Sequence, residues 1–206
     1  MIKAALFDVD GVILVGRECL FSERLAKHQD IPGAHVSEFF AKDFKKCSFG
    51  KADLKEVLTP YLSKWKWKGS VDDLCSFWFE NEGIIDAELL AIVTKLRGSG
   101  IKCYVATRQE KYRLKYLVDS LGLKNHFDGV FSTCDVGFDK DTFEFYENIF
   151  HQTGLAPDEI LFFDDKEVNV KTARSLGIRA CFYQGIEDLK VQAEPILSEV
   201  TADTSD

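Results

Sequence analysis

The stretch Leu6-Phe7-Asp8-Val9-Asp10-Gly11-Val12 decides the fold and locates the chemistry. A short apolar run leads directly into two carboxylates separated by one residue, and a glycine follows them. In a parallel α/β sheet, ligands bind beyond the carboxyl ends of the strands. We therefore expect Asp8 and Asp10 at that edge of a sheet, although Asp and Gly are also common in ordinary turns at strand ends.

Four later segments are also short, continuous apolar runs, which is the pattern of strands buried on both faces. They lie at 103–106, 130–131, 160–163 and 178–182. Segments with helical periodicity lie among them, at about 87–96, 111–121, 142–153 and 168–176. Strands that alternate with helices of this length predict an α/β fold with a Rossmann-like, doubly wound parallel sheet.

The stretch from Val15 to Gly83 differs from the rest, because it carries aromatic and charged residues at helical spacing and no strand-like run. We expect residues 15–84 to form an α-helical insertion, and residues 1–14 and 85–206 to form a discontinuous core. Trp65–Gly69 is expected to connect two helices of the insertion. The tail from Ile186 is expected to form a weak helix with a frayed end.

A second strand repeats the pattern of the first, because the run 160–163 ends in Asp164 and Asp165. If the two strands are neighbours, as many as four carboxylates converge, which is costly unless a cation or a proton intervenes. Oxygen ligands with no histidine or cysteine nearby favour magnesium. A helix N-cap followed by a first-turn acid explains one such pair, but not two strands that end in the same way.

Two further residues are candidates for binding an anion. Thr107 follows the run 103–106 and opens a helical segment, where free main-chain amides and the helix dipole favour phosphate. Thr107–Glu110 also has the pattern of a capping box, which for this segment alone is the stronger interpretation. Lys140 precedes the helix predicted at 142–153 and could neutralise both Asp8 and a phosphoryl group, although a single lysine is usually a solvated surface charge.

These pieces, in this order, resemble the motifs of the haloacid dehalogenase superfamily of phosphohydrolases. The four similar motifs are a D-x-D-G sequence, a threonine at a strand end, a lysine before a helix and a pair of aspartates, namely Asp8 to Gly11, Thr107, Lys140 and Asp164-Asp165. The resemblance covers about residues 1–14 and 85–185, and the insertion at 15–84 resembles the helical cap of the subfamily that contains small-metabolite phosphatases. Asp141 stands where relatives usually have proline after the lysine, which leaves the main chain at Lys140 less fixed.

The resemblance implies a magnesium-dependent phosphatase that acts on a small phosphorylated metabolite through an aspartyl-phosphate intermediate. Asp8 would be the nucleophile, and Asp10 would be the general acid and base. The other implied site residues are the metal ligands Asp8, Asp10 (through its main-chain carbonyl), Asp165 and Asp164, the phosphate-binding residues Thr107, Arg108 and Lys140, and Asn169, which would orient the metal shell or the loop of the fourth motif.

Other activities of the superfamily remain alternatives. Metal-independent dehalogenases lack the second carboxylate of the first motif, so Asp10 argues against that activity. A phosphomutase stays open, and so does a phosphonate-cleaving enzyme, which would need a cap lysine such as Lys42, Lys45, Lys46 or Lys51. A non-catalytic, phospho-ligand-binding regulatory module on the same fold is an alternative from another class, although such proteins often lose a motif carboxylate.

The composition limits the partners and the compartment. The 206 residues carry a formal net charge of −8, which argues against general nucleic-acid binding because that needs a basic face. The six cysteines form no C-x-x-C pair, so we expect free thiols in a reducing cytoplasm. We expect no signal peptide, and no membrane span either, because no apolar stretch reaches roughly 18 residues. No motif indicates the oligomeric state or the exact substrate. The cap residues that could each face the site or simply face solvent are Arg17, Arg24, His28, Lys45, Lys51 and Trp65.

Overall fold

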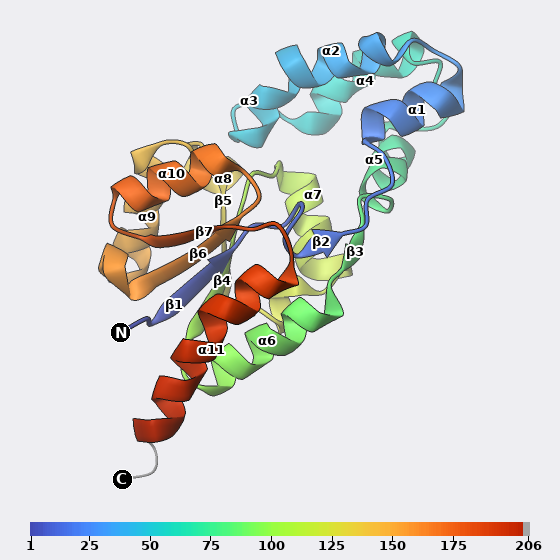
Figure 1. Ribbon diagram of the computed structural model, residues 1–206. Helices are drawn as coiled ribbons and strands as arrows, with labels where there is room; N and C mark the ends of the chain where they lie inside the picture. The colour runs from blue at the N-terminus through green and yellow to red at the C-terminus, as the bar shows by residue number, and fades with distance from the viewer. Residues whose placement is uncertain (204–206) are drawn as a thin grey trace.

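A parallel five-stranded sheet forms the centre of the computed structural model, which describes residues 1–203 (Figure 1). The strand order is β5-β4-β1-β6-β7. The strands are β1 (Ala4–Phe7), β4 (Lys102–Thr107), β5 (Gly129–Ser132), β6 (Ile160–Asp164) and β7 (Arg179–Phe182). Each strand coincides with or overlaps an apolar run noted in the sequence, and the predicted fold class is confirmed.

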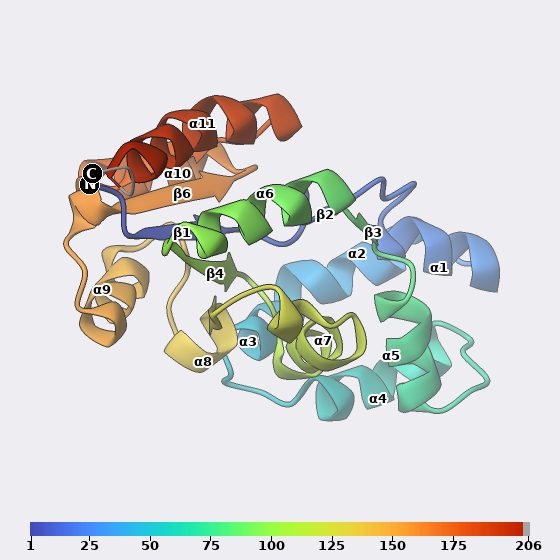
Figure 2. The same ribbon diagram turned by 90° about the horizontal axis from the view of Figure 1, so that it is seen from below.

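Successive residues of each strand face opposite layers of helices. Phe7 and Phe163 lie in a core shared with α6 and α11, which run side by side along one face of the sheet (Figure 2). Leu6 and Phe162 lie in a second core, shared with α9 and α10 on the opposite face. The helices of the two layers are α6 (Ala87–Gly98), α11 (Ile186–Asp203), α9 (Phe143–Thr153) and α10 (Glu167–Ser175). Strands buried on both faces cannot alternate in polarity, which explains the continuous apolar runs.

The helix predicted at 111–121 begins as expected but changes form along its length. It consists of α7 (Lys111–Lys115) and a single π-helical turn, Tyr116–Ser120. Glu110 caps α7, because its carboxylate accepts hydrogen bonds from the main-chain amides of the second and third helical residues, at 2.9 and 2.5 Å. The capping-box interpretation of Thr107–Glu110 is therefore wrong, since the chain enters the helix later than that pattern requires.

The shorter elements of the core complete the connections. They are α8 (Thr133–Val136) and two 3₁₀ turns, Leu123–Asn125 and Pro157–Glu159. All six cysteines are free thiols, as expected. In the part of the chain that the structure describes, no helix combines the length and the apolar character that crossing a bilayer requires.

Five helices between the first strand and α6 form a separate group, which we call the cap (Figure 1). They are α1 (Phe21–Gln29), α2 (Gly33–Lys42), α3 (Phe44–Ser48), α4 (Leu54–Lys64) and α5 (Val71–Phe79). The cap has its own hydrophobic core, which is rich in aromatic rings and includes all three tryptophans, Trp65, Trp67 and Trp78. Trp65–Gly69 lies in the connection between α4 and α5, as predicted.

The chain enters and leaves the cap through a two-stranded antiparallel ribbon. Its strands, β2 (Leu14–Val15) and β3 (Ile84–Ile85), have two residues each. A pairing this short leaves no period-2 pattern to recognise, so the sequence did not indicate it.

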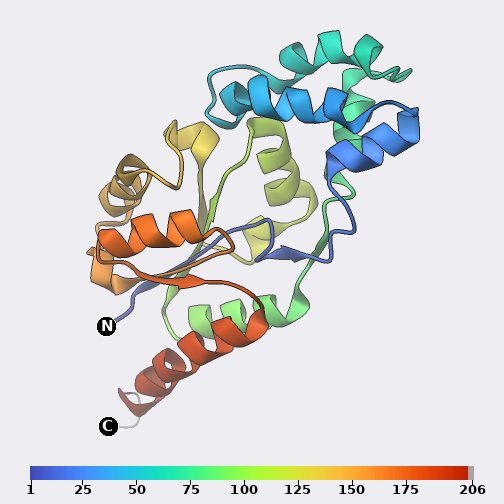
Figure 3. The same cartoon turned by 45° about the horizontal axis from the view of Figure 1, so that its top comes forward.

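The cap lies beyond the carboxyl ends of the strands and contacts the core there (Figure 3). Asp53, the N-cap of α4, accepts a hydrogen bond from the Tyr112 hydroxyl at 2.8 Å and pairs with Lys111 at 2.5 Å. Elsewhere along the boundary, the Thr133 hydroxyl donates to the main-chain carbonyl of Ser48 at 2.6 Å. These contacts hold the cap over the edge of the sheet at which α/β proteins bind ligands.

Candidate active site

The register of the sheet brings the acids of two strands together. Phe7 of β1 pairs with Phe163 of β6, so the residues that follow them, Asp8 and Asp164, are neighbours at the strand ends. Carboxylate oxygens of Asp8, Asp164 and Asp165 lie within 4.8 Å of one another. The structure thus assembles three of the four acids that the sequence analysis expected to converge, and like charges at this separation need a compensating cation.

Lys140 supplies one such charge. Its Nζ lies 2.7 Å from Asp8 Oδ1 and 2.7 Å from Asp164 Oδ2, and it donates to the main-chain carbonyl of Ala106 at 3.2 Å. Its side chain is only 2% exposed. Burial acts to lower the pKa of Lys140, but the two carboxylates outweigh burial and the net pKa is raised, so the side chain is a cation. A lysine whose most common role is a solvated surface charge is here enclosed among the acids.

Asp8 is a buried carboxyl group with one oxygen left unbonded. Its Oδ1 accepts hydrogen bonds from the Val9 amide at 2.8 Å and from Lys140. No donor within residues 1–203 bonds to its Oδ2, and Asp8 lines a cavity of about 220 Å³. Burial raises the pKa of Asp8 to about 7, although Lys140 acts in the opposite direction. A second cation in the cavity would favour the charged form, which is the form that can attack phosphorus.

The two aspartates at the end of β6, Asp164 and Asp165, differ in their hydrogen bonding. Asp164 is saturated, because it accepts hydrogen bonds from Lys140 at 2.7 Å, from the Lys166 amide at 2.8 Å and from the Asn169 side chain at 3.0 and 3.1 Å. Asp165 pairs with the Lys166 ammonium through Oδ2, at 2.8 Å, while its buried Oδ1 has no hydrogen-bond partner. A buried carboxylate oxygen without a partner is costly, and a divalent cation would satisfy it.

The residues present therefore fit a magnesium ion. The donors at this edge of the sheet are hard carboxylate oxygens, and the cluster contains no thiolate and no imidazole. Asp8 and Asp165 each have an oxygen available, whereas Asp164 holds Lys140 and Asn169 in position.

Gly11 allows the two motifs to approach each other. Its φ is +87°, and a Cβ at this position would lie 2.7 Å from Asp165 Oδ2. An L-residue would be strained by both the dihedral angle and the contact. Glycine is therefore required at position 11, because any larger residue would collide with Asp165.

Asp10 lies outside the acid cluster and is held by two residues that the sequence analysis did not identify. Arg113 binds it with both terminal nitrogens, at 2.6 and 2.8 Å, and Gln109 donates to it at 2.8 Å. Arg113 also donates to the Gln109 side chain at 2.6 Å and is only 7% exposed. Burial acts to raise the pKa of Asp10, but Arg113 outweighs it and the net pKa is lowered. The one available signal was the spacing of Gln109 and Arg113, which are four residues apart at the start of a predicted helix.

Of the three residues expected to bind phosphate, Lys140 and Arg108 line the cavity at Asp8 and Thr107 does not. Asn169 lines this cavity too. Arg108 is anchored by Asp139, whose Oδ1 accepts hydrogen bonds from Nε at 2.8 Å and Nη2 at 2.5 Å. Thr107 is buried at the end of β4, where its hydroxyl accepts a long hydrogen bond of 3.4 Å from Gln109, and it is not part of the cavity wall.

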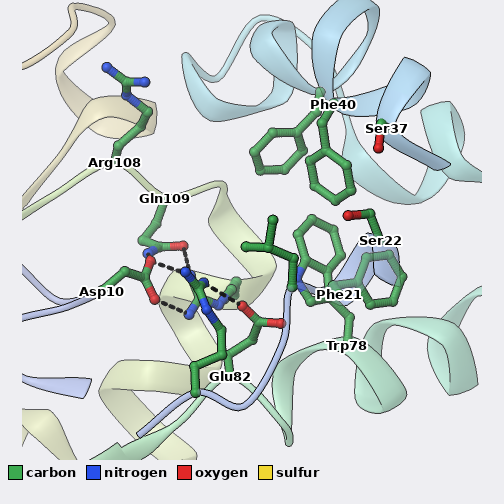
Figure 4. A pocket seen from close by; sticks show the side chains of 13 residues that line it. Asp10, Phe21, Ser22, Ser37, Phe40, Trp78, Glu82, Arg108 and Gln109 are labelled. Atoms are coloured by element: carbon green, nitrogen blue, oxygen red, sulfur yellow. Dashed lines mark hydrogen bonds and ion pairs between the residues drawn. The ribbon is translucent and has the colours of Figure 1, made fainter. Parts of the chain in front are cut away.

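A second cavity, of about 320 Å³, adjoins the first between the cap and the core (Figure 4). Asp10, Arg17 and Arg108 line both cavities, so these three side chains form their common boundary. Of the cap residues considered from the sequence as possible substrate contacts, Arg17 lines these cavities, where it pairs with Glu82 at 3.1 Å. Trp65 is instead buried in the cap, and Lys45 and Lys51 lie over the Phe49 ring.

The fold and the aspartates at the ends of β1 and β6 are those of a hydrolase with an α/β fold and a carboxylate site, and comparison with known proteins identifies the family. The model of the haloacid dehalogenase-like hydrolases matches residues 2–177, so the chain belongs to this family. The predicted resemblance is confirmed.

Individual relatives are distant. The chain is 25% identical to a sesquiterpene phosphatase, astK, of Aspergillus oryzae, over 85% of this chain and 87% of the relative. It is 23% identical to the GMP/IMP nucleotidase YrfG of Escherichia coli, over 96% and 92%. A structure of the family enzyme bt-2542 from Bacteroides thetaiotaomicron, in complex with magnesium and inorganic phosphate, superposes with a TM-score of 0.76 at 21% identity, over 88% of this chain and 93% of the other.

Proposed function

We propose that the protein is a magnesium-dependent hydrolase of phosphate monoesters that works through an aspartyl phosphate on Asp8. The observation that carries this proposal is the free Oδ2 of Asp8 beside an orphaned oxygen of Asp165 and the ammonium of Lys140. The names of the relatives agree with it, since one is a phosphatase and one a nucleotidase, and a structural neighbour binds magnesium and phosphate.

In the first step, the Asp8 carboxylate forms a bond to phosphorus as the bond between phosphorus and the ester oxygen breaks. Lys140 and Arg108 bind the oxygens of the transferring group and offset its charge. Asp8, Asp165 and the main-chain carbonyl of Asp10 would hold the magnesium ion, which supplies further positive charge at the same oxygens. The cap reduces the access of bulk water to this step.

Asp10 is the general acid of the first step and the general base of the second. It gives a proton to the departing alcohol, and then accepts one from the water that hydrolyses the aspartyl phosphate. Because Arg113 lowers the pKa of Asp10, the resting side chain is a carboxylate, which suits the second step. Asp10 must gain a proton from solvent when the substrate binds, and esters with acidic alcohols need that proton least.

The cap supports a phosphatase more than a phosphonate-cleaving enzyme. Among the described residues, none of the four candidate Schiff-base lysines lines either cavity at the site. Two of them, Lys45 and Lys51, contact Phe49, and Lys42 pairs with Glu38.

The test is hydrolysis of p-nitrophenyl phosphate and of a panel of phosphorylated metabolites, with and without magnesium. We expect activity that depends on magnesium, a phosphorylated enzyme after acid quenching, and loss of both in Asp8→Asn. Asp158→Asn changes the same side chain at an exposed site and should behave like the wild type. Normal turnover in Asp8→Asn would refute the nucleophile, and phosphate binding without any turnover would favour a non-catalytic module.

A further inference from the structure

The second cavity has the position of a leaving-group site. It adjoins the cavity at Asp8, and Asp10, Arg17 and Arg108 line both. The phosphoryl group must lie at Asp8, and the alcohol oxygen must lie within reach of Asp10, which protonates it. The rest of the alcohol then extends into the space between the cap and the core (Figure 4). Its volume of about 320 Å³ lies at the lower end of the range for small-molecule sites, about 300–1,000 Å³.

The wall of this cavity is aromatic on its cap side. Phe40 and Phe44 are half-buried, and their ring centroids are 5.3 Å apart. Behind them, Phe21 and Trp78 are buried and stacked on each other at 4.8 Å. Leu20, which also lines the cavity, is 50% exposed. Half-buried rings and an exposed leucine together in one concave site favour a flat, apolar ligand surface.

The charged groups lie at one end of the cavity. Asp10 and Glu82 are paired with arginines, Arg113 at 2.6 Å and Arg17 at 3.1 Å. Figure 4 shows Asp10, Gln109 and Arg108 together on one side, and Phe40, Ser22 and Ser37 on the other. The aromatic end therefore offers no charge to bind a carboxylate or a second phosphate on the alcohol.

Two hydroxyl groups provide the polarity of the aromatic end. Ser22 and Ser37 both line the cavity and point toward it (Figure 4). Within residues 1–203, neither hydroxyl has a hydrogen-bond partner in the protein. A hydroxyl both donates and accepts, so the pair suits a ligand that carries neutral hydrogen-bonding groups on its edge.

We propose that the alcohol part of the substrate is an uncharged, planar ring system with hydrogen-bonding groups on its edge, as in a nucleoside 5′-monophosphate. The ring faces pack against Phe40 and Phe44, and the edge meets Ser22 and Ser37. This inference rests on the proposed function, because that function places the phosphoryl group at Asp8.

The test measures binding by calorimetry to the Asp8→Asn variant with magnesium, so that no turnover is needed. The probes are guanosine 5′-monophosphate (planar ring, polar edge), 1-naphthyl phosphate (planar ring, no polar edge), farnesyl monophosphate (apolar, no ring) and glycerol 3-phosphate (neither). We expect the guanosine compound to bind most tightly, at least about tenfold tighter than glycerol 3-phosphate. The ring proposal is overturned if glycerol 3-phosphate or farnesyl monophosphate binds as tightly, and the polar edge is overturned if 1-naphthyl phosphate does.

A paired substitution ties the preference to this cavity. Leu20→Ser removes an apolar surface, and serine is favourable at the N-cap of α1 that Leu20 occupies. We expect the ratio of affinities for guanosine 5′-monophosphate and glycerol 3-phosphate to fall about fivefold. Val191→Ser changes an apolar side chain that is 63% exposed on α11 and should leave the ratio unchanged. An unchanged ratio in Leu20→Ser would place the ring elsewhere. Selective binding without hydrolysis by the wild type would refute the proposed function alone.

Discussion

Arg113→Met removes the cation that holds Asp10, and we expect it to lower both the free energy of unfolding and kcat. The substitution deletes two charge-assisted hydrogen bonds to Asp10, of 2.6 and 2.8 Å, and one to Gln109 of 2.6 Å. Such a bond contributes about 1.5–3 kcal/mol when a charged group takes part. The Asp10 side chain is 30% exposed, so water replaces part of the loss. We therefore expect the free energy of unfolding to fall by about 2 kcal/mol at pH 7.

The loss of stability in Arg113→Met should depend on pH in a defined direction. The pKa of Asp10 is lowered in the folded protein, so the pair stabilises fully above the pKa of an unfolded aspartate, about 3.9. The contribution disappears as the pH falls through the lower pKa of the folded state. The difference in unfolding free energy between the wild type and Arg113→Met should accordingly shrink below about pH 4.

Urea unfolding followed by circular dichroism measures the stability, and steady-state kinetics with p-nitrophenyl phosphate measures turnover. We expect kcat to fall about 10- to 100-fold, because a positioned acid–base group contributes about 10²–10⁴ and Asp10 keeps its charge but loses its orientation. Lys124→Met breaks the exposed pair with Asp119 and should cost no more than about 0.5 kcal/mol, with kcat unchanged. Wild-type stability and kcat in Arg113→Met would refute the reasoning, as would additive losses with Asp10→Asn.

Three further substitutions or titrations probe other parts of the molecule. Gly11→Ala puts a Cβ 2.7 Å from Asp165 Oδ2 at a φ of +87°, so magnesium affinity measured by calorimetry should fall at least about tenfold; an affinity within twofold of the wild type would contradict this. Asp53→Ala removes the N-cap of α4 and the pair with Lys111 and should lower the free energy of unfolding by about 1–2 kcal/mol. Asp53→Asn keeps the capping acceptor and should lose less than half as much, so equal losses in urea titrations would mean that capping is not the source. Burial raises the pKa of Asp8 to about 7 in the metal-free protein, and the proton must leave before magnesium binds. Magnesium affinity should therefore weaken about tenfold per pH unit below pH 7 and level off above it, and a constant affinity from pH 5.5 to 7 would exclude this competition.

The sheet could be predicted from the sequence because its central strands are buried on both faces. β1 and β6 have no exposed residue, so each forms an uninterrupted apolar run that ends in acids. The ribbon of β2 and β3 has two residues per strand and leaves no comparable pattern. The capping residue of α7 was predicted wrongly for a local reason, since Glu110 and Thr107 are both chemically suitable caps and only the path of the main chain decides between them.

The acids of the site could be predicted for the same reason, because parallel strands end at one edge. Asp8 and Asp164 meet through the register of two adjacent strands. The contact between Arg113 and Asp10 spans 103 residues and depends on the direction of one helix, which no local pattern encodes. The aromatic cavity likewise depends on how the cap rests on the core, and the sequence indicates only that the rings exist.

Because Trp65, Trp67 and Trp78 all lie in the cap, the intrinsic tryptophan fluorescence of the protein reports on the cap. Indole emission comes from the cap alone, with Trp65 and Trp67 in the connection between α4 and α5 and Trp78 in α5, and Trp78 lines the cavity beneath the cap. A ligand ring that enters the cavity should quench this light, whereas events confined to the sheet and its flanking helices should leave it unchanged. Stopped-flow traces of the native protein can thus time the arrival of a ligand and the motion of the cap without an attached dye.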